Sequence, residues 1–352
     1  MKLGKRAAFA LAAGSFCLLY TIFAIKPLET EYQFNPEWKI DVANPSTTKL
    51  SDDEEILPFK LGQSMGYFTT DGKVAAFVSF PYKASITEDA YVSYTANNSN
   101  ATVYSPDGKE LYRLKIEGFP HLTENKTFVF QPGGTSFVMC DEKGNAKWNY
   151  AGISPVSAFN TSENAVAAGF ADGTICEFDL EGNLLNKFAP TGSNYPGIHG
   201  IDVSDDGKYL AVISGMDKQR FLLCYVDGHN SKIVHHSYMD SSDPLQKIVK
   251  FSKDNSTILY NHGSHISILD VASRKQADID IKGHAIKIIE DKNNFFVLSK
   301  MKNTYSVYII EKFATLTGSF SFEAQNAFIE AKDGKLYVGR DTHISCIKIT
   351  RE

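Results

Sequence analysis

The sequence predicts an all-β protein: a seven-bladed β-propeller of four-stranded antiparallel blades, preceded by one N-terminal transmembrane helix. Three observations carry this prediction. Hairpin-like segments recur about every forty residues, their turns share a glycine at the same place, and no stretch of the body has the 3.6-residue period of a helix. A chain of 352 residues that is 43% hydrophobic is long enough for one large folded domain.

Each repeat consists of a short apolar strand that ends in an acidic or polar residue, a tight turn and a second strand. Equivalent positions lie about 41 residues apart on average. They are Ser105, Asp141, Asp179, Asp227, Asp270, Glu311 and Thr350. The turns PDGK, EKGN and LEGN place glycine where a tight connection demands positive φ. We therefore expect each hairpin to join the third and outer strands of one blade.

The last repeat offers only three strands, and an unpaired edge is a liability that closed propellers avoid. The segment EEILPFKLGQ, residues 54–63, has the pattern of an outer strand and precedes an expected inner strand around Gly66–Thr70. We therefore expect Ile56–Lys60 to complete the last blade and close the ring.

The first repeat contains an apparent insertion at Pro81–Asn100, with an extra strand at Tyr91–Tyr94. Insertions on a rigid scaffold are frequent binding surfaces. We therefore name Tyr82, Tyr91 and Tyr94 as candidate partner-binding residues.

A basic flank (Lys2, Lys5, Arg6) precedes an uncharged run from Ala7 to Ile25. This run has about the length that an apolar helix needs to cross a bilayer, and its basic flank favours a cytoplasmic N-terminus. The pattern predicts a single-pass protein of the inner (cytoplasmic) membrane whose C-terminal domain is extracytoplasmic, in the periplasm.

Three segments follow from these patterns. Residues 1–26 are expected to be a signal anchor, residues 27–54 a polar, proline-containing tether, and residues 55–352 the propeller.

The charge and cysteine content exclude two classes of function. The formal net charge is −5 and no Lys/Arg cluster is present, which argues against a nucleic-acid partner. No pair of cysteines has the spacing of a metal site. The four cysteines of the body lie in apolar, strand-like stretches, where we expect them to be buried and unpaired: Cys140, Cys176, Cys224 and Cys346.

The sequence contains no recognised catalytic, phosphate-binding or dinucleotide-binding motif. It therefore predicts no catalytic residue and no cofactor, and it favours a binding protein over an enzyme. His121, His199 and His284 fall near the starts of inner strands and could face the central channel as a small-ligand site, together with Asp202 or Glu290. The favoured alternative is that these histidines satisfy backbone groups at the blade junctions.

A second set of histidines occurs at the turn NHGSH (His262 and His265) and on an outer strand (His235 and His236). Imidazole binds zinc and copper, but neither spacing is diagnostic and no acidic co-ligand is fixed by the sequence. We therefore interpret them as surface residues and predict no metal site.

The repeats resemble the WD-repeat and quinoprotein-like propeller superfamily over residues 55–352. The period, the turns SPDGK, SDDGK and AKDGK, and the strand endings FDLEGN and LDVASRK carry the resemblance. No Trp-Asp pair ends a strand, and the recurring tryptophan docking motif of cofactor-binding quinoproteins is missing, with Trp148 alone in the expected blades.

The exported propeller is also similar to the propeller subunit of the bacterial outer-membrane barrel-assembly machine. This resemblance implies a protein-binding scaffold of the cell envelope whose partners are envelope proteins. The alternative is a central-channel small-ligand sensor or a metal-dependent hydrolase similar to the calcium-dependent propeller lactonases.

Overall fold

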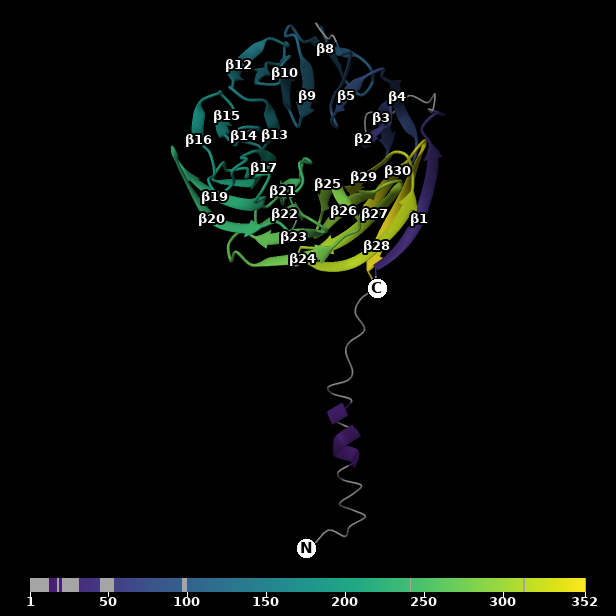
Figure 1. Ribbon diagram of the computed structural model, residues 1–352. Helices are drawn as coiled ribbons and strands as arrows, with labels where there is room; N and C mark the ends of the chain where they lie inside the picture. The colour runs from purple at the N-terminus through teal and green to yellow at the C-terminus, as the bar shows by residue number, and fades with distance from the viewer. Residues whose placement is uncertain are drawn as a thin grey trace, which may run out of the picture.

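The computed structural model describes residues 13–17, 19–20, 32–44, 54–96, 100–240, 242–312 and 314–351. Within this part of the chain the strands form eight antiparallel sheets around a central axis (Figure 1). The all-β propeller is confirmed. The expected number of seven blades is wrong, because the described residues form eight.

Blades 1 to 8 each run from an inner strand beside the central axis to an outer strand. They are β2(Ile56–Leu61), β3(Ser64–Thr69) and β4(Val74–Ser79); β5(Lys83–Ile86), β6(Tyr91–Tyr94), β7(Thr102–Tyr104) and β8(Glu110–Arg113); β9(Phe119–Thr123), β10(Lys126–Phe130), β11(Ser136–Cys140) and β12(Ala146–Ala151); β13(Val156–Thr161), β14(Ala165–Phe170), β15(Ile175–Asp179) and β16(Leu184–Phe188); β17(Ile198–Val203), β18(Tyr209–Ser214), β19(Arg220–Asp227) and β20(Asn230–Tyr238); β21(Val249–Phe251), β22(Thr257–His262), β23(His265–Asp270) and β24(Gln276–Asp280); β25(His284–Asp291), β26(Asn294–Met301), β27(Thr304–Glu311) and β28(Thr315–Glu323); and β29(Ala327–Lys332), β30(Lys335–Arg340), β31(His343–Arg351) and β1(Tyr32–Asp41).

The seven repeats of the sequence belong to blades 2 to 8. Blade 1 was not recognised as a repeat because it has only three strands, β2, β3 and β4. Its turn at residues 70–73 (TDGK) resembles the turns of the other blades, but no hairpin precedes it at the repeat spacing. The sequence therefore appeared to contain one blade fewer.

The strand that closes the ring is β1, and not the expected Ile56–Lys60. β1 pairs antiparallel with β31 from Tyr32↔Arg351 to Asp41↔His343, with a bulge between Pro36 and Trp38. A proline is tolerated there because β1 is the outer strand of its blade. Residues 32–41 of the expected tether are thus part of the propeller, and the segment Ile56–Lys60 is the inner strand of blade 1.

The inner strand of blade 1 runs in the opposite direction to its neighbour in blade 8. Glu55, just before β2, forms an ion pair of 2.5 Å with Lys332 at the end of β29. At the other end of β2, a Cβ atom on Gly62 would lie 3.1 Å from Nδ2 of Asn326, just before β29. Blade 1 therefore begins with a strand of reversed polarity, which leaves it three-stranded.

The apparent insertion at residues 81–100 supplies regular strands. β5 and β6 are the inner and second strands of blade 2 and pair through Lys83↔Tyr94 to Ile86↔Tyr91. The strand expected at Tyr91–Tyr94 exists, but it is an ordinary part of its blade.

The expected transmembrane helix is not a feature of the described structure. Among the residues that the structure describes, no helix is long and apolar enough to cross a membrane. Of the run from Ala7 to Ile25, only residues 13–17 and 19–20 are described, and they are helical. The rest of that run lies outside the described residues.

Two ends of the ring can be distinguished by their loops. In blades 2 to 8 the turns between second and third strands lie at the same end as the connections that lead from each outer strand to the next inner strand, because antiparallel strands alternate in direction. We call this end the connection face. The apolar core lies between adjacent blades, where for example Phe221 of blade 5 stacks on Tyr260 of blade 6 with ring centroids 3.9 Å apart.

Candidate functional site

Two histidines flank the tight turn of blade 6 on the connection face. β22 ends at His262, Gly263 and Ser264 make the turn, and β23 begins at His265. Gly263 has φ +63°, the left-handed conformation that such a short hairpin turn requires. His262 and His265 are direct cross-strand partners, so their side chains lie on the same face of the sheet.

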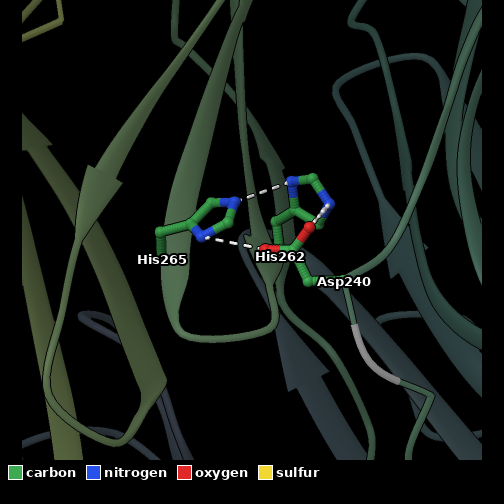
Figure 2. Close-up of side chains that lie close together, drawn as sticks. All are labelled: Asp240, His262 and His265. Carbon is green, nitrogen blue, oxygen red and sulfur yellow. Dashed lines mark hydrogen bonds and ion pairs between the residues drawn. The ribbon is translucent and has the colours of Figure 1, made fainter.

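The two imidazoles face each other, and an aspartate from the neighbouring blade approaches both (Figure 2). Nε2 of His265 lies 3.0 Å from Nδ1 of His262. The carboxylate of Asp240, which follows β20 of blade 5, lies 3.8 Å from Nε2 of His262 and 3.5 Å from Nδ1 of His265. Together the three residues offer ligand atoms within 4.8 Å of one another, the arrangement of a candidate metal site.

A second carboxylate lies on the other side of the imidazole pair. Oδ1 of Asp278, on β24, is 3.9 Å from Nδ1 of His262 and 4.0 Å from Nε2 of His265. The same oxygen accepts hydrogen bonds from the Ser267 hydroxyl (2.6 Å) and from Nε2 of Gln276 (2.9 Å). Burial alone would raise the pKa of Asp278, but these hydrogen bonds and the nearby imidazoles bring it below the usual value, so the group is ionised.

The cluster rests on a packed polar network between blades 5 and 6. The Tyr260 hydroxyl donates to Oε1 of Gln276 (2.7 Å) and lies 2.8 Å from the Ser237 hydroxyl. The ring of Tyr260 is fully buried under Phe221. These contacts fix Gln276 and, through it, the carboxylate of Asp278.

The sequence identified only half of this cluster. The pair at His262 and His265 is visible in the sequence, although we interpreted it as a surface turn. Only 7% of the His262 side chain and 11% of the His265 side chain are exposed. The two aspartates carry no local signal, because Asp240 comes from another blade and Asp278 meets the pair through strand register. His235 and His236 are consecutive residues of β20, so they point to opposite faces of that strand.

The three histidines expected at the central channel lie on inner strands of different blades. His121 is on β9, where its ring packs edge-on against Phe130 and Phe159 and burial lowers its pKa. His199 is the second residue of β17, and its Nε2 is buried without a hydrogen-bond partner among the described residues. Burial, followed by the nearby Lys247, lowers the pKa of His199.

His284 is the exposed first residue of β25, in blade 7. No hydrogen bond or ion pair between described residues joins any two of these three histidines. A partly open cavity of about 160 Å³ lies between the inner strands of blades 4 and 5 and the segment leading into β21, and its lining includes Asn160, Gln246 and Lys247.

The acidic residues expected beside these histidines bind backbone groups of the next blade. The Asp202 carboxylate accepts from the N–H of Phe251 (2.7 Å) and of Val203 (2.9 Å). The Glu290 carboxylate accepts from the N–H of Lys253 (2.7 Å) and pairs with Lys312 (2.9 Å). Both carboxylates therefore connect adjacent blades.

The three candidate partner-binding tyrosines differ in exposure. Tyr82 is exposed in the connection between blades 1 and 2, and its ring lies edge-on to Tyr94, 6.4 Å away. Tyr94 also contacts Phe119 of blade 3. Tyr91 is buried between Tyr67 and Tyr104 and belongs to the core.

Exposed apolar side chains gather on the connection face. Seven of the twelve large apolar side chains that are exposed on the described propeller lie in its turns and connections or at the strand ends beside them. They are Tyr82, Ile153, Tyr195, Met216, Tyr238, Leu245 and Met301. Tyr195 and Met216 are adjacent, because the N–H of Met216 donates to the Tyr195 carbonyl at 3.0 Å. Tyr195 and Met216 thus form one exposed apolar pair on this face.

Comparisons with known proteins agree with this architecture. An uncharacterized protein of Treponema pallidum is 25% identical over an alignment of 356 positions. The alignment covers 98% of this chain and 94% of the relative. Among solved structures, BamB from Moraxella catarrhalis superposes with a TM-score of 0.59 at 12% identity, covering 90% of this chain and all of that one. This likeness shows a shared fold. A family model described as β-propeller protein matches residues 1–352, and the chain therefore belongs to this β-propeller family.

Proposed function

We propose that this chain is a protein-binding scaffold of the cell envelope, which meets its partner through the connection face. One observation carries the proposal: seven exposed apolar side chains lie at this end of the ring, whereas three lie at the strand ends beside the turns of the opposite end, Leu111, Leu184 and Leu316. Ile153, 93% exposed, is the extreme case. Aromatic and methionine side chains are enriched in protein interfaces, and a closed ring holds them in fixed positions.

The location in the envelope rests on the basic flank and the uncharged run that follows it, a pattern typical of export. The BamB structure supports only the fold, and its role enters here as the reason to look for an envelope partner. A reporter that is active only outside the cytoplasm, fused to the C-terminus, should be active. An inactive fusion of an expressed chain would contradict the location.

The binding face can be tested with matched substitutions. Tyr195→Asp and Leu245→Asp alter exposed residues of connections on the proposed face, and Leu184→Asp and Leu316→Asp alter exposed residues at the opposite end. After crosslinking in intact cells, we expect a discrete set of co-purifying proteins that is lost in the first pair and kept in the second. Equal recovery in all four variants would contradict this choice of face.

A further inference from the structure

We propose that His262, His265 and Asp278 form a binding site for a zinc-class divalent ion, with Asp240 orienting His265 from the neighbouring blade. The inference is independent of the protein-binding role. It starts from the hydrogen bonds of the two imidazoles, because these decide which ring nitrogens carry protons and which offer lone pairs.

The proton of His262 is fixed on Nε2. This nitrogen lies 2.9 Å from the backbone carbonyl of Tyr238, which can only accept a hydrogen bond. In the neutral ring the lone pair is then on Nδ1, which also lies 2.8 Å from the Ser267 oxygen, whose own proton goes to Asp278. Metal-binding histidines typically donate their other N–H to a carbonyl or carboxylate in this way.

His265 is arranged in the complementary sense. Its Nδ1 lies 3.5 Å from Oδ2 of Asp240, which favours the proton on that nitrogen and leaves the lone pair on Nε2. Nε2 of His265 and Nδ1 of His262 are 3.0 Å apart. The lone pairs of these two nitrogens and of the Ser267 oxygen, 2.8 Å from Nδ1 of His262, repel one another unless a proton or a metal ion lies between them. Two nitrogens bound to one zinc ion at about 2.0–2.1 Å would be about 3.3 Å apart, close to the separation found.

Asp278 supplies the third ligand. Its Oδ1 is 3.9 Å from Nδ1 of His262 and 4.0 Å from Nε2 of His265. Movements of less than about 1 Å would bring this oxygen to the ligand–ligand separation of a tetrahedral zinc site, about 3.3 Å. Ser267 and Gln276 already hold this carboxylate in place by hydrogen bonds. Three protein ligands leave a fourth position for water.

The ligand types select the ion. Two imidazoles with one carboxylate suit zinc and related transition metals, whereas magnesium and calcium prefer oxygen ligands alone. An entry path exists, because 59% of the Asp240 side chain and 45% of the Asp278 side chain are exposed. Bound metal would also connect β22, β23 and β24 at the border with blade 5.

Zinc binding to the purified protein after treatment with a chelator tests the proposal directly. Calorimetric titration with zinc chloride should give one equivalent per chain, and magnesium chloride should give none. The His265→Ala variant should lose this equivalent. The matched control is His343→Ala, because His343 is also the first residue of a third strand after a two-residue turn. Absence of stoichiometric zinc binding in the unmodified protein, or equal binding by His265→Ala, would overturn the site.

Two further variants separate the roles of the aspartates. Asp278→Asn should lose stoichiometric binding, whereas Asp240→Asn should keep one ion with about 10–100-fold weaker affinity, the usual effect of removing an outer carboxylate. The reverse pattern would overturn the assignment of Asp278 as ligand. Thermal unfolding with and without zinc provides the folding control: zinc should raise the Tm of the unmodified protein and of His343→Ala, but not that of His265→Ala.

Discussion

The indole ring of Trp38 lies over Gly72, so closely that a Cβ atom at this glycine would be 2.8 Å from the ring carbon Cδ2. Gly72 belongs to the turn between β3 and β4 and has φ +93°. Nε1 of Trp38 donates to the carbonyl of Thr70 in the same turn (3.3 Å). The outer strand of blade 8 is thereby fixed to blade 1, which joins the two ends of the ring.

The second tryptophan makes the same contact elsewhere. Trp148, on β12 of blade 3, covers Gly182 of the β15–β16 turn in blade 4, and its Nε1 donates to the Leu180 carbonyl (3.1 Å). Our sequence interpretation placed Trp148 alone in the blades, which is wrong, because Trp38 occupies the equivalent place on β1. Two of the eight blade junctions are thus held by the same contact, a tryptophan ring over the glycine of a turn in the next blade.

Loss of β1 should destabilise the whole ring. A chain that begins at residue 42 lacks the strand that covers β31, whereas a chain that begins at residue 32 retains it. We expect the shorter chain to lose several kcal/mol of unfolding free energy, since a full ladder and the Trp38 contact disappear. Urea unfolding of the two chains compares them directly. Equal stabilities would contradict the closing role of β1.

A single substitution isolates the aromatic contact at the closure. Trp38→Ala should lower the unfolding free energy by about 3 kcal/mol, toward the lower end of the range for large aromatic truncations because the side chain is only half-buried. The exposed neighbour Lys39→Ala serves as control and should change it by less than about 0.5 kcal/mol. A Trp38→Ala variant as stable as its control would show that the indole does not stabilise the closure of the ring.

The repeat was predictable because its turn chemistry is local. Glycines such as Gly144 and Gly182 have positive φ in the described turns. Each hairpin can therefore be recognised from the four or five residues of its turn. The closing strand was not predictable in this way. The sequence of β1 resembles a linker because it contains Pro36 and many polar residues that are exposed in the structure. The bulge also interrupts the alternation of apolar and polar residues that Tyr32 and Phe34 begin.

The candidate metal site also has one part that local sequence predicts and one part that depends on how the blades pack. The two-residue turn after His262 brings His265 opposite it, a local consequence of hairpin geometry. The contact with Asp240 depends on how blade 5 packs against blade 6, which no spacing in the sequence specifies. The polar network under it has the same tertiary origin.

The four buried cysteines should be unreactive in the folded protein. Cys140, Cys176, Cys224 and Cys346 are buried and free, as the sequence predicted, whereas Cys17 is exposed. Burial raises the thiol pKa of Cys140 and of Cys224 to about 12, so little thiolate is present at neutral pH. Thiol labelling without reductant should modify Cys17 quickly and the other four only after denaturation. Two or fewer additional thiols in the unfolded protein would reveal a disulfide.

The carboxylate of Asp202 should matter for stability, since it holds two buried backbone groups of adjacent blades. Asp202→Ala leaves the N–H groups of Val203 and Phe251 without this acceptor. Each buried donor without a partner costs about 1–3 kcal/mol. Chemical unfolding should therefore show a loss of at least about 2 kcal/mol, while the exposed Asp227→Ala shows almost none. A loss as small as that of Asp227→Ala would assign Asp202 no structural role.

Glu177 should make the stability of the protein depend on pH. Its side chain is fully buried in β15, and neither carboxylate oxygen has a hydrogen-bond partner among the described residues. Burial raises its pKa from 4.5 to about 7. Between these two values the unfolded chain releases the proton while the folded chain keeps it. The unfolded state therefore binds fewer protons, and stability falls as the pH rises through this window.

Replacing the carboxyl group with an amide removes this proton linkage. The stability of Glu177→Gln relative to the unmodified protein should increase by about 3 kcal/mol between pH 4 and pH 8, because a shift of one pKa unit corresponds to 1.36 kcal/mol. Most of the increase should fall between pH 4.5 and pH 7. Glu142→Gln, an exposed residue of the turn after β11, controls for the general effect of removing a negative charge. Urea unfolding at several pH values measures the difference, and parallel curves for Glu177→Gln and the unmodified protein would show that the pKa of Glu177 is the same in the folded and unfolded chains.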